Sequence, residues 1–295
     1  MNAGNPSAAI SARIIDTIEN IEYIGASPEF IIQLMPMFTS EKSDVAEISA
    51  IIAREQSIAA MVLKLANSVY FSRGTIFSSL PQAIVHLGLD IVKKLVIAYE
   101  MIDLCSGKGP DLRDYENDLL KSSIAGASIA ADIAEKNGLI ERDEVYLCGL
   151  LRDFGVLVIK QYLPDIFKQI HALSLEKKVP FGVACDMICG FNHRYISFLL
   201  FSRWNLPSNI LSIFEQGISR YGVWVIIEKI IDFTDFILKK NGYGQWDPYA
   251  LPLLQEGAVF SLNEEEYCKS VGPRLQEVDE FLAMIFDPVT GIKAA

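Results

Sequence analysis

Several features that would mark a function class are scarce or missing from this sequence. Histidine occurs only three times in 295 residues, and the five cysteines are an odd and scattered set. In a chain of this length, such a set favours buried reduced thiols over a disulfide framework. The sequence has no GxSxG elbow, no P-loop and no clustered glycine fingerprint, so it lacks the usual motifs of serine hydrolases and nucleotide-binding enzymes.

Long uninterrupted apolar runs are also missing. Every apolar stretch is broken by charge before it reaches 18 residues; VWVIIEKIIDFTDFIL, for example, contains Glu228, Lys229, Asp232 and Asp235. The first twenty residues lack the basic start and continuous apolar block of a secretory signal. We therefore expect no membrane span and a cytoplasmic location.

Basic residues are fewer than acidic ones, 26 against 37. The net charge is −11 and the isoelectric point is about 4.8, so long-range repulsion opposes binding to phosphate backbones. Residues 86–98 superficially resemble a helix-turn-helix with Lys93 and Lys94 on its second helix. Because no further basic cluster lies nearby, the pattern favours two packed core helices, and we expect no nucleic-acid partner.

Helical periodicity is what the sequence does have. Hydrophobic residues make up 51% of the chain, and they recur at helical spacing from residue 44 to residue 285. The predicted helices lie at about 44–56, 58–65, 80–87, 90–99, 120–134, 143–158, 223–238 and 275–285. The 143–158 segment is apolar around most of its circumference and is predicted to be the buried central helix. No alternating strand pattern and no repeat appears, so the predicted fold is all-α.

Polar residues and glycines at the ends of these segments predict where the helices begin and end. Asp44 and Ser79 are placed as N-caps, whereas Gly88 and Gly138 are placed to end helices in a left-handed conformation. Asn67 follows an apolar helix and is expected to bond the free backbone carbonyls and turn the chain.

Five stretches in succession carry a family resemblance. They are PEFIIQLMPMF (28–38), EISAIIAREQSIAAMVLKLANSVYF (47–71), SSLPQAIVHLGLDIVKKLVIA (78–98), GLLRDFGVLVI (149–159) and GFNHRYISFLLFSRWNLPSNI (190–210). The most specific pieces are LKLANS, AIVHLGLD and RWNLP. Together they resemble the HDOD family, the HD-related output domains of bacterial signalling proteins. The resemblance implies an all-α, HD-domain-like multi-helix bundle with additional C-terminal helices, and a regulatory role.

The same resemblance sets the expected domain boundaries. It implies an N-terminal helical extension at 1–23, the HDOD domain at 24–220 and a C-terminal helical extension at 221–295. Within that extension, NGYGQWDPYALP (241–252) reads as a linker. The last apolar stripe could dock on the same chain or form a dimer seam, since both need the same surface; it comprises Leu275, Val278, Leu282 and Ile285.

The resemblance also points to a metal site that has lost its ligands. HD hydrolases bind a divalent metal through a His-Asp pair on the central helix, and here the pair reads Arg152-Asp153. A guanidinium has no lone pair to donate, so it cannot replace a histidine ligand. The upstream histidine falls at Ser122, or with a one-residue slip at Lys121. Asp153 and His193 survive, and two ligands hold a catalytic metal poorly.

Arg152 and Asp153 each allow two readings. The Arg152 guanidinium could occupy the former metal position and bridge Asp153 or another carboxylate, or it could be an ordinary surface arginine. Asp153 is either a remnant of the metal site or a helix-surface carboxylate; the apolar surroundings favour the remnant.

The remaining candidate ligands are weak. Cys185 and Cys189 are spaced like half a zinc site, but His193 lies eight residues beyond the first of them, too far along a helix to converge on one ion. Buried thiols are the favoured interpretation. His86 and His171 have no partner in the sequence and are assigned no role.

Three functions remain open. The preferred one is a non-catalytic signalling output or adaptor module that needs no cofactor and binds a protein partner or a small ligand; whether it does so as a homodimer is left open. The second is a degenerate metal-dependent phosphohydrolase, and the third is a sensor that binds a nucleotide without turnover.

Overall fold

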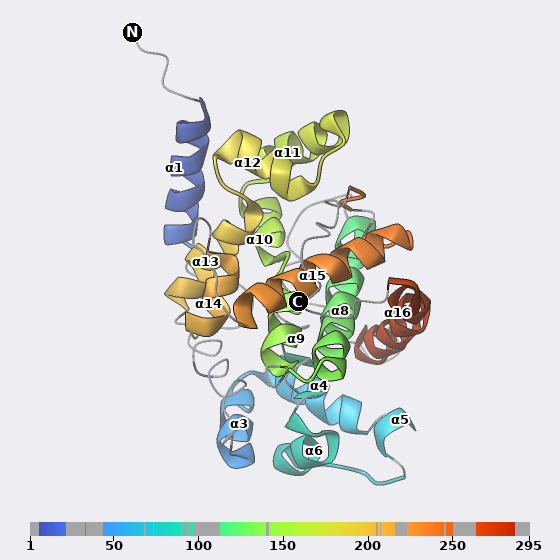
Figure 1. Cartoon of the computed structure of the whole chain (residues 1–295). Helices are drawn as coiled ribbons and strands as arrows, with labels where there is room; N and C mark the ends of the chain where they lie inside the picture. Colours follow the sequence, from blue (N-terminus) through green and yellow to red (C-terminus); the bar gives the residue numbers. More distant parts are fainter. Residues whose placement is uncertain are drawn as a thin grey trace. The chain divides into compact units, whose positions relative to one another are not determined.

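The fold is entirely helical wherever it is described. The structure is a computed structural model, and it describes residues 6–21, 33, 44–67, 69–72, 74–89, 91–92, 95–96, 99, 113–139, 142–204, 206, 208–215, 223–244, 246–249 and 264–286. Within these ranges there are α-helices and turns but no strands (Figure 1), which confirms the all-α prediction. None of the helices found there combines the length and the apolar character that a bilayer crossing requires.

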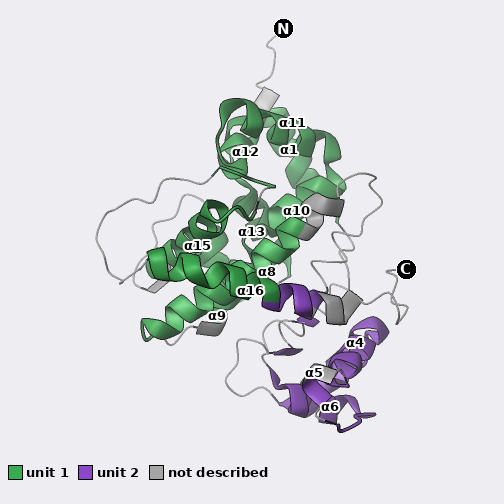
Figure 2. Cartoon of the chain, turned by 90° about the vertical axis from the view of Figure 1, so that its right-hand side faces the viewer, with its two compact units in different colours: residues 1–21, 107–276 green, residues 22–106, 277–295 purple. Residues whose placement is uncertain are grey.

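Two compact units make up the chain (Figure 2). Unit 1 comprises residues 1–21 and 107–276, and unit 2 comprises residues 22–106 and 277–295. Each unit therefore takes segments that are far apart in the sequence. The domain boundaries expected from the sequence remain a prediction.

Unit 2 contains a small helical core. Its helices are α3 (Val45–Ile52), α4 (Gln56–Ala66), α5 (Val69–Ser72) and α6 (Leu80–Leu87). Helices α3, α4 and α6 pack against one another, because each presents an apolar face at helical spacing. The fully buried residues of this core include Ile48, Ile52, Ile58, Val62, Ala83 and Ile84.

The predicted helix ends in unit 2 are partly confirmed. The Asp44 carboxylate accepts a hydrogen bond from the Ala46 amide at 2.9 Å and so caps α3. Ser79 occupies the N-cap position of α6, but its side chain makes no capping bond. Gly88 follows α6 with a positive φ of 82°, although its ψ of 150° takes it outside the left-handed helical conformation that was expected.

Asn67 does more than end a helix. Its side-chain amide donates to the Leu63 carbonyl at 2.8 Å, as expected for a residue that closes α4. It also donates to the Phe77 carbonyl and accepts from the Phe77 amide, both at 2.7 Å. His86 holds the same loop, since its ring stacks on Phe77 and its Nε2 lies 2.7 Å from the Phe71 carbonyl oxygen.

Unit 1 is the larger bundle. Its helices are α1 (Pro6–Glu19), α8 (Arg113–Lys136), α9 (Arg142–Leu151), α10 (Phe154–Tyr162), α11 (Pro164–Lys177), α12 (Phe181–Cys189), α13 (His193–Arg203), α14 (Ser208–Phe214), α15 (Val223–Lys240) and most of α16 (Glu264–Phe286). In Figure 1, α9 runs beside α8 while α15 crosses α8, and α1 lies against α12 and α13. Small residues permit the close packing of α8 and α9: a Cβ on Gly149 would lie 3.0 Å from the Cα of Ala127.

The predicted central helix is not continuous. Helix α9 ends at Leu151 and α10 starts at Phe154, so Arg152 and Asp153 form a buried corner between two helices. The Gly155 amide donates to Ser197 Oγ on α13 at 2.8 Å and does not join the helical ladder. This cross-helix bond gives a partner to one of the first-turn amides of α10, which have none within their own helix.

The C-terminal stripe is covered within the chain as far as the structure describes it. In unit 1, Tyr267 of α16 packs edge-on against Phe233 of α15, and Arg274 forms an ion pair with Asp132 of α8. Leu275 of unit 1 is buried, and so are Val278 and Leu282, which belong to unit 2. The Ile285 side chain lies outside the described residues, as do Lys93 and Lys94. Dimer formation remains a prediction.

Candidate functional site

The corner between α9 and α10 carries a buried ion pair. Arg152 Nη2 and Nε donate to Asp153 Oδ2 at 2.6 and 2.9 Å. The two side chains are only 6% and 5% exposed. The same guanidinium reaches α15, where Asp235 Oδ1 lies 3.2 Å from Nη2. Arg152 therefore bridges two carboxylates from different helices, as one of the two sequence hypotheses proposed, and the surface reading of both residues is wrong.

His193 completes this cluster from the start of α13. Its Nε2 lies 3.4 Å from Asp153 Oδ1, an ion-pair distance that is longer than an ordinary hydrogen bond. Its Nδ1 makes no hydrogen bond with any described residue. The ring packs edge-on against Phe181, and its Cε1 and Nδ1 atoms would lie 3.1 Å from a Cβ on Gly182. The helix start is set by Asn192, whose side chain accepts from the Tyr195 amide.

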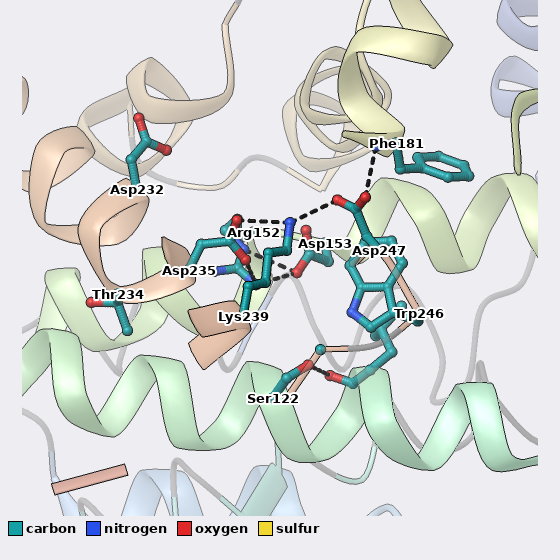
Figure 3. A network of polar contacts seen from close by, with 12 residues as sticks. Ser122, Arg152, Asp153, Phe181, Asp232, Thr234, Asp235, Lys239, Trp246 and Asp247 are labelled. Atoms are coloured by element: carbon teal, nitrogen blue, oxygen red, sulfur yellow. Dashed lines mark hydrogen bonds and ion pairs between the residues drawn. The ribbon is translucent and has the colours of Figure 1, made fainter. Parts of the chain in front are cut away.

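A second buried group of charges continues from Asp235. Lys239, one turn along α15, lies 2.9 Å from Asp235 Oδ2 and 2.8 Å from Asp247 Oδ2 (Figure 3). Asp247 follows the end of α15, and its other oxygen accepts from the Phe181 amide of α12 at 2.9 Å. Lys239 also donates to the Tyr249 carbonyl at 3.1 Å. The contacts form a chain from α10 and α13 through α15 to the start of α12.

The pKa values of the two buried aspartates are shifted in opposite directions. Burial alone would raise the pKa of Asp153, but the adjacent Arg152 guanidinium, together with His193, outweighs it and holds that pKa well below its usual range. At Asp247 burial prevails over the attraction of Lys239, and the pKa of the carboxyl is raised. Burial would lower the pKa of Arg152 and of Lys239, but their carboxylate neighbours raise both. Asp153 is therefore a firmly ionised carboxylate, whereas the fold disfavours the charge of Asp247.

Ser122, the position where the resemblance places an upstream histidine, is buried on α8 and lies apart from the charged cluster in Figure 3. Its hydroxyl donates to the Leu119 carbonyl of its own helix at 3.0 Å. The segment after α15 passes close to Ser122, since a Cβ added to Gly244 would lie 3.9 Å from Ser122 Cβ. The structure thus brings together Arg152, Asp153 and His193, and it leaves Ser122 out. That these positions descend from a metal site stays a prediction.

A divalent metal does not fit the side chains present at the corner. One oxygen of Asp153 is bonded twice by the Arg152 guanidinium, and a fixed positive charge lies between Asp153 and Asp235 where a cation would need them. Within the described residues, no three histidine, cysteine, aspartate or glutamate side chains are grouped so that they could hold an ion.

The remaining candidate ligands lie elsewhere. Cys185 and Cys189 are buried on α12, and Cys185 Sγ donates to the Phe191 carbonyl. Gly190 ends that helix in the left-handed conformation, so Cys189 and His193 are on different helices. His171 stacks on Phe167.

Sequence reasoning missed three members of the charged network: Asp235, Lys239 and Asp247. A signal was available for the first two, because they are spaced i, i+4 on a strongly apolar helix, the spacing of an intrahelical ion pair. No local pattern pairs Asp247 with the Phe181 amide, which is 66 residues away.

The sequence model of the HDOD domain matches residues 24–217. The chain belongs to the HDOD family. Comparison with solved structures extends the agreement in fold. This HDOD protein superposes on an HDOD domain protein of unknown function from Geobacter sulfurreducens with a TM-score of 0.65 and 21% identity, covering 97% of this chain and 99% of that one.

Two further structures share the fold. A putative signal transduction protein from Marinobacter aquaeolei VT8 matches with a TM-score of 0.70 and 18% identity, over 97% of this chain and 67% of that one. A putative phosphohydrolase from Shewanella amazonensis SB2B matches with a TM-score of 0.63 and 18% identity, over 92% and 98%. An uncharacterized protein of Treponema pallidum (strain Nichols) is 20% identical over 203 residues, which are 69% of this chain and 38% of that protein. The HDOD chain thus spans well under half the length of that relative.

The raised pKa of Asp247 leads to a test of the network. A group whose folded pKa is raised stabilises the fold below its unfolded pKa, and this contribution is lost as the pH rises through the folded pKa. Asparagine resembles the neutral acid at every pH. We therefore expect Asp247→Asn to lower the free energy of unfolding by no more than about 1.5 kcal/mol at pH 7, and by more at pH 4. Urea unfolding of both proteins at the two pH values measures this; a cost that increases with pH would contradict it.

Proposed function

We propose that this HDOD protein is a non-catalytic signal-transduction module, which binds a protein partner or a small ligand and passes on a regulatory state. The observation that carries the proposal is the Arg152 guanidinium held between Asp153 and Asp235. A permanently charged cation that is paired with two carboxylates offers neither a Lewis acid nor a free base, so it supports a structural role for the cluster.

The shape of the network suggests how such a module could transmit a state. The charged contacts tie α10, α13, α15 and the start of α12 to one another through buried groups. A binding event that displaces one of these segments would leave buried charges without partners, which is costly. The helices should therefore move together. A partner or ligand that stabilises one arrangement of them over another would then change the arrangement throughout unit 1.

The alternative is a metal-dependent phosphohydrolase with an unusual ligand set around Asp153 and His193. Its support is the shared fold with the putative phosphohydrolase of Shewanella amazonensis, and at 18% identity that likeness concerns the fold alone.

Metal content separates the two functions. The protein is purified without chelators, offered manganese, iron, zinc and nickel in turn, and analysed by mass spectrometry beside His193→Ala. We expect less than about 0.1 metal per chain in both proteins, since a site with two protein ligands binds poorly, and no release of phosphate from nucleotides or cyclic dinucleotides. Near-stoichiometric metal in the wild type that is lost in His193→Ala, with turnover, would establish the hydrolase instead.

Arg152→His serves as the companion variant because it restores the His-Asp sequence. If the guanidinium is a fixed replacement for a metal, this variant should melt at a lower temperature, since Asp153 and Asp235 lose their bridge. An unchanged melting temperature without any gain of metal would show that Arg152 has no such role.

A further inference from the structure

The segment that follows α15 is held by hydrogen bonds from its backbone to α8 and by the packing of its tryptophan ring on α12. We call residues 241–244 and 246–249 the strap. The Asp118 carboxylate of α8 accepts from the strap's Gly244 amide at 3.3 Å and from its Trp246 amide at 3.0 Å. Gly242 and Gly244 have positive φ angles of 82° and 69°, so the chain turns sharply at both. Trp246 is 4% exposed, and its ring packs on Phe181.

Asp247 of the strap fills a position that is built to hold an anion. Its carboxylate accepts from the amide of Phe181, the first residue of the nine-residue helix α12, and from the ammonium of Lys239 (Figure 3). An amide at a helix start together with a lysine is the donor set with which proteins bind phosphate and carboxylate ligands. Both donors belong to helices, whereas the anion belongs to the strap. The carboxylate can therefore leave while its donors stay in place.

An independent observation points to a ligand at the same helix start. His193 is 8% exposed, and the edge of its ring that carries Nδ1 and Cε1 lies against Gly182, the second residue of α12. This buried nitrogen makes no hydrogen bond with any described residue. Buried polar atoms are bonded in the great majority of cases, and an exception calls for an explanation such as a bound water, an ion or a functional role. A molecule bound at the start of α12 could supply the missing bond.

The internal carboxylate is also a poor occupant of its position. Burial raises the pKa of Asp247 in spite of its contact with Lys239, so the fold disfavours this charge relative to water. In addition, Lys239 divides its attraction between Asp247 and Asp235. An anion with more oxygen atoms offers acceptors beyond the two that the Phe181 amide and Lys239 occupy.

We propose that the strap is an autoinhibitory segment, in which Asp247 occupies an anion site that a phosphorylated small molecule takes when the strap is displaced. Lys239 and the Phe181 amide are the donors to the phosphate, and His193 Nδ1 is a further contact. The inference rests on the proposed function and deepens it, because it names the ligand class and makes strap release the regulated step. Only molecules with an open strap bind the ligand, so the apparent affinity is the intrinsic affinity multiplied by the fraction of molecules in which the strap is open.

Loosening the strap without touching the donors provides the test. Asp118→Ala removes the acceptor of two strap amides and leaves Lys239, Phe181 and His193 unchanged. We expect it to bind pyrophosphate at least about 10-fold more tightly than the wild type in calorimetric titrations at fixed ionic strength. Asp165→Ala is the matched control, since it removes the same charge at an exposed ion pair with Arg13. It should bind as the wild type does.

A second variant and a second measurement guard against misfolding of Asp118→Ala. Asp247→Asn removes the internal anion while retaining an oxygen for the Phe181 amide, and it should also bind pyrophosphate more tightly. In the wild type, saturating pyrophosphate should speed hydrogen exchange at the Gly244 and Trp246 amides. Equal affinity in all folded variants, or exchange at these amides that pyrophosphate does not change, would overturn the proposal. Neither result depends on metal content, so the proposed function is tested separately.

Discussion

Asp153→Asn should lower the free energy of unfolding at pH 7 by about 3–5 kcal/mol, the usual cost of removing one partner from a buried ion pair. The carboxylate is bonded twice by Arg152 and faces His193, and the Arg152 side chain is only 6% exposed. Asparagine keeps the shape but not the charge. The guanidinium would then remain buried with Asp235, which is itself shared with Lys239. Chemical denaturation of the two proteins measures the loss.

The sign of the pH dependence adds a sharper criterion. The folded pKa of Asp153 is lowered, so its contribution to stability is present above the ordinary aspartate pKa and is lost as the pH falls toward the folded value. The cost of Asp153→Asn should therefore shrink below about pH 4, opposite to the trend expected for Asp247→Asn. Asp165→Asn is the control, because its partner Arg13 is 53% exposed and such surface pairs contribute roughly 0–1 kcal/mol. Equal costs for Asp153→Asn and Asp165→Asn would show that the corner is not the buried pair described.

Gly155→Ala is expected to destabilise the protein by roughly 3 kcal/mol or more, at the upper end of overpacking effects. A Cβ on Gly155 would lie 2.0 Å from the His193 carbonyl oxygen and 3.0 Å from both the His193 carbonyl carbon and Ser197 Oγ. The atom that is struck belongs to the backbone of α13, so no side chain can rotate away. Separating α10 from α13 would also break the bond from the Gly155 amide to Ser197.

The same substitution at Gly272 provides a matched control. Gly272 lies inside α16, has ordinary helical φ, and would place its Cβ in open space. There, alanine gains helix propensity, but it precedes Pro273, whose ring disfavours helical backbone at a residue with a Cβ, so stability should change by no more than about 1 kcal/mol. Thermal or urea unfolding of both variants decides the matter. If Gly155→Ala lowers the free energy of unfolding by less than about 1 kcal/mol while Gly272→Ala behaves as expected, that result would contradict the close contact between α10 and α13.

Local patterns were sufficient for much of the fold. Apolar residues at helical spacing correctly predicted the cores of α3, α4, α6 and α15, because each of these helices buries one face. Short-range rules also predicted Asp44 as a cap. The same reasoning failed at Arg152 and Asp153, where periodicity continued across a break. At the start of α10 the Gly155 amide bonds to Ser197, which is 42 residues away, and no local pattern predicts that contact.

The candidate site divides in the same way. The sequence by itself determined that Arg152 cannot be a metal ligand, since the absence of a lone pair is a property of the guanidinium in any fold. It also singled out Asp153 and His193. Only the tertiary structure decided that the guanidinium also reaches Asp235 on α15 and that Asp247 lies at the start of α12. Those contacts join residues that are dozens of positions apart, and their geometry follows from how whole helices pack.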